Sequence, residues 1–84
     1  MNTNRQDLIN KIKYRSLYRG TKEMDLFISK FVNSIIQDLD LNQLTELNNL
    51  VNLDDEELIK ISDEKINGKE KKIILLFKKF KKKY

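Results

Sequence analysis

The sequence predicts an all-α protein, a compact bundle of about five short helices. Apolar residues recur at steps of three and four along most of the chain, which is the spacing of a helix face. No stretch shows sustained alternation with a period of two, as a half-buried strand would. The 84 residues include no proline and only two glycines, so no linker divides the chain and residues 1–84 are predicted to form one domain.

The first predicted helix covers residues 4–17. Leu8, Ile9, Ile12 and, less regularly, Leu17 have helical spacing, and Thr3 or Asn4 is available as the N-cap. Gly20 then interrupts the pattern. The second predicted helix has the clearest periodicity in the chain, with apolar residues at Met24, Phe27, Ile28, Phe31, Ile35 and Leu39.

The third and fourth predicted helices begin with the same sequence pattern. Asp40 with Gln43, and Asp54 with Glu57, have the spacing of a capping box, in which two side chains bind each other's backbone amides. An apolar residue precedes each cap and can pack on the fourth helical residue. The third helix then points Leu44, Leu47, Leu50 and Val51 inward, and the fourth ends at about residue 61 or 62.

The fifth predicted helix follows the turn dipeptide Asn67-Gly68. Lysines occupy its other faces, and its end over residues 78–84 could be mobile. One face is apolar and consists of Ile73, Leu76, Phe77, Phe80 and Tyr84.

The composition excludes several classes of site. Without cysteine there is no disulfide or thiolate-ligated metal, and without histidine the commonest general base and metal ligand are missing. Glycine occurs only at positions 20 and 68, so no Gly-x-Gly-x-x-Gly loop can hold a dinucleotide. Carboxylates, lysines and tyrosines are what remain for catalysis, and we expect no metal and no independently bound cofactor.

The longest apolar runs are far shorter than the ~20 residues that span a bilayer, so no transmembrane segment is expected. The first residues also lack the apolar stretch of a secretory signal. We expect a cytoplasmic protein that is monomeric when free.

Charge is distributed in three blocks. Residues 1–22 carry six positive and one negative charge, residues 23–68 three positive and eleven negative, and residues 69–84 eight positive and one negative. Such segregation indicates surfaces of opposite sign, which steer partners.

The junction between the first two helices has features that a simple bundle does not require. Gly20 allows a tight backbone and close approach by a partner. If Gly20 caps the second helix, Glu23 occupies its third position, where a carboxylate faces free amides. Arg15 and Arg19, two of the three arginines, flank this junction and can supply bidentate donors. The alternative is purely structural: a helix stop, a dipole-favoured carboxylate and solvated charges.

Residues 19–23 read Arg-Gly-Thr-Lys-Glu and so contain Arg-Gly-x-x-Glu. Tyr14-Arg15-Ser16 precedes this motif, Met24-Asp25-Leu26 follows it, and an acidic helix start lies downstream at Leu53-Asp54-Asp55. With these flanks the chain, over roughly residues 8–80, resembles the small flavinylation factors that assemble succinate dehydrogenase. It departs from them at Tyr18, where members often have a basic residue, and at Ile61, where they often have an aromatic one.

The resemblance implies an assembly factor without chemistry of its own. Its partner would be the flavoprotein subunit of succinate dehydrogenase, and the related fumarate reductase could be a second one. The partner would hold the FAD and supply the histidine that bonds to it. The resemblance assigns close approach to Gly20, charged hydrogen bonds to Arg19 and Glu23, and supporting contacts to Arg15, Tyr18 and Asp25.

A nucleic-acid-binding or anionic-membrane-binding module is the competing interpretation. It would use the lysines of residues 69–83 with their interleaved aromatic residues. We do not expect nucleic acid as a partner, because those aromatic residues have the spacing of a core-facing stripe and the centre of the chain is acidic.

Overall fold

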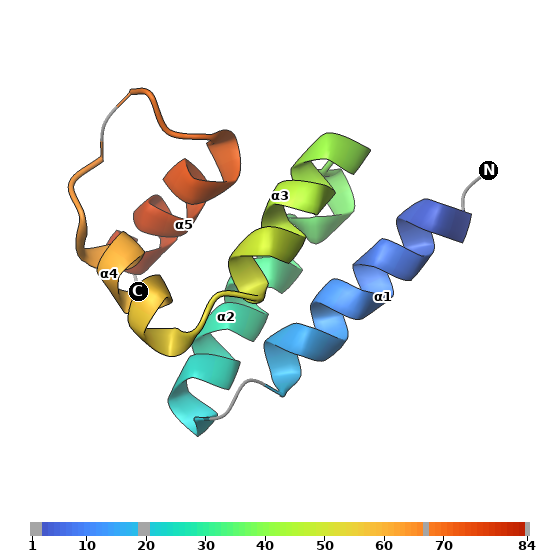
Figure 1. The fold of residues 1–84 in the computed structure, drawn as a ribbon, viewed down its shortest axis with the longest axis horizontal. Helices are drawn as coiled ribbons and strands as arrows, with labels where there is room; N and C mark the ends of the chain where they lie inside the picture. Colours follow the sequence, from blue (N-terminus) through green and yellow to red (C-terminus); the bar gives the residue numbers. More distant parts are fainter. Residues whose placement is uncertain (1–2, 19–20, 67, 84) are drawn as a thin grey trace.

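The computed structural model describes residues 3–18, 21–66 and 68–83. Over these ranges the chain forms five α-helices and one short 3₁₀ helix, with no strand, which confirms the predicted fold class (Figure 1). The elements are α1 Thr3–Leu17, α2 Lys22–Ile35, η1 Ile36–Asp38, α3 Leu41–Val51, α4 Asp55–Asp63 and α5 Lys72–Lys83.

Helices α2 and α3 form the centre of the molecule. Helix α1 packs against both on one side, and α5 packs against α3 and α4 on the other (Figure 1). Phe27 and Phe31 of α2 meet Phe77 and Phe80 of α5, with ring centroids 5.3–5.7 Å apart. These tilted and edge-on ring contacts join the two halves of the bundle.

Two helix boundaries differ from the prediction. Thr3 and Asn4 both lie within α1, so neither is its N-cap. Helix α2 ends at Ile35 instead of continuing to Leu39, and η1 follows it. The reason is local, because Leu39 must adopt an extended backbone, with φ −89° and ψ 142°, to lead into the Asp40 cap. The backbone changes, but Leu39 is still buried in the core.

The capping box predicted at α3 is confirmed in both directions. The Gln43 amide donates to the Asp40 carboxylate at 2.8 Å, and the Asp40 amide donates to the Gln43 side chain at 3.1 Å. At α4 only one half forms, in which the Glu57 amide donates to the Asp54 carboxylate at 2.9 Å. If the Glu57 side chain accepted a hydrogen bond from the Asp54 amide, its carboxylate would lie close to the Asp54 carboxylate and the two negative charges would repel each other. The Gln43 side chain is neutral, so the equivalent hydrogen bond at α3 has no such cost.

The apolar face predicted for α5 lies toward the core. Ile73 and Phe77 are buried and Leu76 and Phe80 half-buried, while Tyr84 lies outside the described residues. None of the helices in the described ranges is long and apolar enough to cross a membrane.

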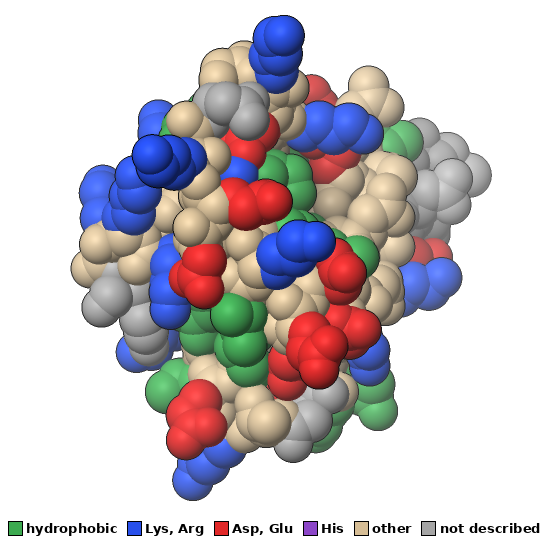
Figure 2. All heavy atoms as spheres, turned by 60° about the vertical axis from the view of Figure 1, so that its left-hand side comes forward, with side chains coloured by type: hydrophobic (Ala, Val, Ile, Leu, Met, Phe, Trp, Pro, Cys, Tyr) green, Lys and Arg blue, Asp and Glu red, His purple; other side chains and the backbone are tan. Residues whose placement is uncertain are grey.

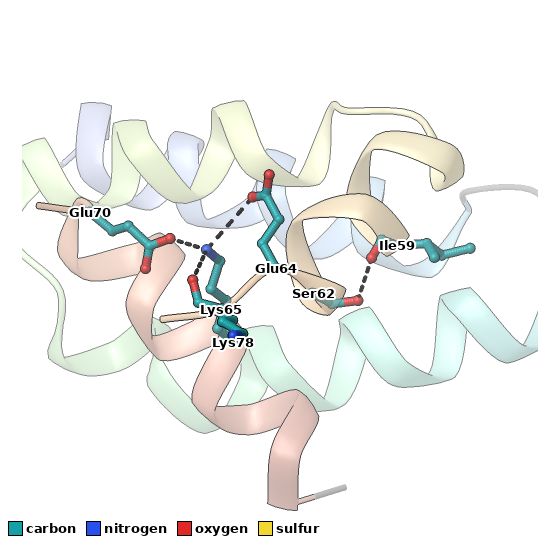
Figure 3. Close-up of polar contacts among 6 residues, drawn as sticks. All are labelled: Ile59, Ser62, Glu64, Lys65, Glu70 and Lys78. Atoms are coloured by element: carbon teal, nitrogen blue, oxygen red, sulfur yellow. Dashed lines mark hydrogen bonds and ion pairs between the residues drawn. The ribbon is translucent and has the colours of Figure 1, made fainter. Parts of the chain in front are cut away.

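Lys78 is an exception to the predicted division of α5 into one apolar, core-facing side and other faces occupied by lysines. Its side chain is buried, and the residue is only 1% exposed. The Lys78 ammonium donates to the Lys65 carbonyl at 3.2 Å, pairs with Glu70 and lies 3.7 Å from Glu64 (Figure 3). Burying an ammonium is costly unless it is paired and hydrogen-bonded, and here the connection between α4 and α5 provides these partners.

Candidate partner-binding surface

The predicted site falls where α1 ends and α2 begins. Arg19 and Gly20 lie outside the described residues, so their predicted roles have no structural counterpart here. The other four predicted residues are placed at this junction. Arg15 and Tyr18 belong to the end of α1 and the residue after it, and Glu23 and Asp25 to the first turn of α2.

Thr21, rather than Gly20, is the N-cap of α2. Its backbone is extended, with φ −105° and ψ 145°, and its hydroxyl accepts a hydrogen bond from the Met24 amide at 3.3 Å. The prediction of a Gly20 cap is therefore wrong by one residue, because threonine supplies the side-chain oxygen that glycine lacks. Glu23 consequently occupies the second helical position.

Although the N-cap is Thr21, the carboxylates near it still face the free backbone amides at the start of α2. Glu23 and Asp25 both lie in the first turn of α2, where unpaired amides create a partial positive charge. Glu23 is exposed, and a partner can therefore reach its carboxylate. An exposed carboxylate held at a helix start is a suitable acceptor for a charged hydrogen bond from outside.

Exposed aromatic and apolar side chains surround the junction. Tyr14 and Tyr18 are 68% and 63% exposed, and their rings contact each other with centroids 4.8 Å apart. Leu17 and Leu26 are about half exposed and line a hollow of about 230 Å³ that also includes Asp25. We call Tyr14, Leu17, Tyr18 and Leu26 the junction patch.

Only Tyr18 of the junction patch was among the predicted site residues. Leu17 continues the apolar spacing of α1, so periodicity alone favours an inward position for it. The signal that distinguishes these residues is exposure, which depends on how α1 ends against its neighbours. Exposed apolar side chains gathered at one place, with tyrosines among them, are typical of protein-binding surfaces.

Arg15 faces the start of α4. It is half-buried and lines a hollow of about 410 Å³ with Asp54, Asp55 and Glu56. Its Nε is buried and has no hydrogen-bond partner within the described part of the chain. The acidic helix start that forms part of the sequence resemblance therefore lies beside the junction, although more than 30 residues separate the two in sequence.

The face that carries α4 and α5 bears charges of both signs. Figure 2 shows a group of acidic side chains toward the lower right of this face and a group of basic ones toward its upper left edge, with further charges of both signs and apolar side chains between them. The first turn of α4 contributes Asp55, Glu56 and Glu57, and the last turn of α5 contributes Lys81, Lys82 and Lys83. This arrangement offers complementary charge to a partner that is itself mixed in sign.

The chemistry available at this surface is recognition. Among the described residues no group of three acidic side chains is arranged to hold a metal ion. The side chains that the surface offers are phenols, carboxylates, a guanidinium and aliphatic groups. They can bind and orient a protein partner through burial and charged hydrogen bonds.

Comparison with known proteins agrees with this description. A family model described as "flavinator of succinate dehydrogenase" matches residues 10–83. A search of curated proteins and a search of solved structures each gave no match. The matched range includes the whole junction between α1 and α2, the acidic start of α4 and the length of α5.

Proposed function

This chain belongs to the flavinator of succinate dehydrogenase family, and from that premise we propose that the junction patch and the charged residues beside it bind the flavoprotein subunit. The family promotes attachment of FAD to that subunit. The chain is accordingly an assembly factor and not a catalytic enzyme, as the resemblance implied.

The observation that carries this proposal is the exposure of the junction patch next to the Arg-Gly-x-x-Glu motif. Core side chains such as Phe31, Leu44 and Phe77 are fully buried, and Leu41 and Ile59 are each about half exposed on other helices. At the junction two tyrosines and two leucines are exposed together. Burying them against a partner would recover roughly 25 cal/mol per Å² of apolar area, which the free chain leaves unused.

Charged groups at the same surface would set the orientation of the partner. Glu23 accepts hydrogen bonds, Arg15 and Arg19 donate them, and Asp25 and Tyr18 support these contacts. Arg15 is only half-buried, so the accessible part of its guanidinium could donate to an acceptor from the partner. Gly20 would allow the two backbones to approach closely.

In this proposal the reacting groups belong to the partner. The chain contains no histidine, so the histidine that bonds to the flavin lies on the flavoprotein subunit, as does the FAD. The chain binds no cofactor independently. Its contribution is to hold the subunit in the conformation in which the histidine and the flavin meet, so that both reacting groups are correctly positioned.

We extend the proposal to three further properties. The related flavoprotein subunit of fumarate reductase is a second client, the protein acts in the cytoplasm, and it is a monomer when free. The absence of cysteine supports a reducing compartment. Co-purification with each flavoprotein subunit and sedimentation of the free protein test the first and the last of these.

The competing function, binding of nucleic acid or anionic membrane by α5, has less support. Phe77 and Phe80 pack against the rings of α2, so they are not available for stacking on bases. Lys78 is buried and cannot contact phosphates. Retention on DNA with a steep dependence on salt, together with no binding to the flavoprotein, would favour this alternative.

The decisive experiment measures covalent flavin on the partner. The flavoprotein subunit is produced with and without this chain, separated on a denaturing gel and scanned for flavin fluorescence. We expect a strong signal with the wild type and a loss of most of it with Glu23→Ala or Gly20→Arg. Leu41→Glu, at the far end of α2 and α3, is the control and should retain the signal. Equal fluorescence in every lane, with and without the chain, would overturn the proposal.

A further inference from the structure

A groove opens between α2, α4 and α5, next to the junction but on a different side of α2. Its volume is about 220 Å³. Both charged residues among its lining, Glu23 and Lys81, lie at exposed positions. We call this the α2–α4–α5 groove, and its principal lining residues are Glu23, Met24, Phe27, Ile59, Phe77 and Lys81.

The size of the groove decides what kind of occupant it fits. Sites for small molecules and cofactors usually measure about 300–1,000 Å³. A volume of about 220 Å³ is smaller than this and suits one large side chain. Anchor residues of protein partners fill pockets of this kind at interface hot spots.

The lining favours an aromatic occupant. Phe27, which is 8% exposed, lies in the floor of the groove with the buried Phe77 beneath it, and Met24 adds a polarisable sulfur. The Lys81 ammonium lies 5.5 Å from the centre of the Phe27 ring, at a distance typical of cation–π contact. A second ring in the groove could contact the same ammonium and pack on Phe27 and Met24.

Charge and position connect the groove to the proposed interface. Glu23 lies at the start of α2, so its carboxylate belongs both to the Arg-Gly-x-x-Glu motif and to the wall of the groove. A basic residue beside the entering ring would pair with Glu23. A partner that covers the junction patch and contacts the Arg-Gly-x-x-Glu motif beside it therefore reaches the groove at Glu23.

We propose that the α2–α4–α5 groove receives an aromatic side chain of the flavoprotein subunit, adjacent to a basic residue that pairs with Glu23. This inference rests on the proposed function, because it takes the flavoprotein subunit as the partner. It adds a second contact area, formed by α4 and α5, that the motif at the junction does not predict.

Ile59→Glu and Leu41→Glu are a matched pair of variants for testing the groove. Ile59 lines the groove and is 50% exposed, while Leu41 is 52% exposed at the start of α3, away from the groove. Ile59→Glu should weaken flavoprotein binding by about tenfold or more, as expected when an interface anchor loses its pocket. Leu41→Glu should leave the affinity within about twofold. Titration calorimetry measures both, and circular dichroism verifies that each variant is folded.

Lys81→Glu provides a second test should Ile59→Glu fail to fold. Lys81 is exposed on α5, and its reversal places a second negative charge opposite Glu23. The inference expects weaker binding of the flavoprotein. Unchanged affinity for this variant and for Ile59→Glu, with wild-type binding intact, would overturn the groove proposal and leave the proposed function standing. Absence of any binding by the wild type would instead overturn the proposed function.

The chemistry of the occupant can be read by NMR. In the full chain labelled at methionine and isoleucine methyl groups, an aromatic ring entering the groove shifts the Met24 and Ile59 signals upfield when flavoprotein is added. Ile9, on the buried side of α1, should not shift in this way. Methyl signals without ring-current shifts would contradict an aromatic occupant. Loss of a wild-type dimer on Ile59→Glu substitution would show that a second copy of the chain fills the groove and would also overturn the inference.

Discussion

The two ends of the α1–α2 pair differ in how far their polar groups are hydrogen-bonded and their apolar side chains buried within the chain. At the closed end, where α1 begins and α3 starts, Arg5 donates to the carbonyls of Gln37 and Leu39 at 3.2 and 3.1 Å. The capping box of Asp40 is closed there and Leu39 is buried. At the open end the junction patch is exposed, and the Nε of Arg15 has no partner among the described residues.

This difference separates two uses of the same kinds of residue. The closed end uses an arginine and a cap to fix the fold. The open end leaves several apolar side chains exposed. In the proposed function these are the groups that bind the flavoprotein subunit. Substitutions at the closed end should therefore change stability, and those at the open end should change binding.

The largest effect is expected from Leu39→Ala at the closed end. Leu39 is buried in the core, and truncating a buried leucine costs about 2–5 kcal/mol of unfolding free energy. Urea denaturation followed by circular dichroism measures this loss. The fraction that remains folded should bind the flavoprotein subunit as the wild type does. A decrease in the free energy of unfolding of less than about 1 kcal/mol would contradict the interpretation that side chains at this end are buried to stabilise the fold.

The second largest effect is expected at the open end, where binding should change and stability should not. Replacing Tyr14 and Tyr18 by alanine should weaken flavoprotein binding by roughly 10- to 30-fold, because exposed tyrosines of this kind act as anchors. The two rings contact only each other among the aromatic residues described, so the free energy of unfolding should fall by less than about 1 kcal/mol. A double variant that loses stability but binds normally would reverse the assignment of the two ends.

A smaller contrast is expected between two helix caps. Asp40→Ala should cost about 1 kcal/mol or slightly more, since it removes a hydrogen bond of 2.8 Å and opens the capping box. Thr21→Ala removes one bond of 3.3 Å and should cost about half as much. Thermal unfolding of the two variants side by side measures the difference. Equal losses would show that the cap of α2 is as tightly closed as that of α3.

The smallest effect is expected from Arg5→Lys. Lysine keeps the charge but lacks the planar fork that reaches two carbonyls at once, so we expect a loss of under about 1 kcal/mol. The same substitution at Arg15 should leave stability nearly unchanged and weaken flavoprotein binding. Urea denaturation and titration calorimetry on both variants would distinguish them, and identical behaviour would remove the contrast between the two arginines.

Local features of the fold could be predicted from the sequence, and tertiary features could not. The capping box at Asp40 depends on residues three apart, which a sequence shows directly. The cap of α2 was misplaced because Gly20 and Thr21 are adjacent and both can begin a helix. The end of α2 at Ile35 was missed because Ile36 and Leu39 keep the helical spacing while the backbone changes.

The candidate site was predictable where it is a contiguous motif. Glu23 and Asp25 lie at the start of α2 as the motif implies. The hollow between Arg15 and the start of α4, the exposure of Leu17 and Leu26 and the α2–α4–α5 groove all arise from packing between separate helices. No spacing in the sequence encodes which of two helix faces a distant element will cover.

Because Lys78 is buried in the folded protein, the reactivity of its amine indicates whether α5 is docked. Amine-reactive labels modify exposed lysines, so Lys79 and Lys81 should react quickly, while Lys78, directly before Lys79 in the sequence, stays unmodified. Detachment of α5 or opening of the α4–α5 connection would release Lys78 from Glu70 and expose it to the label. Mass spectrometry of one short peptide would thus follow the docking of α5 in crude extracts, where spectroscopic probes of this small protein cannot be used.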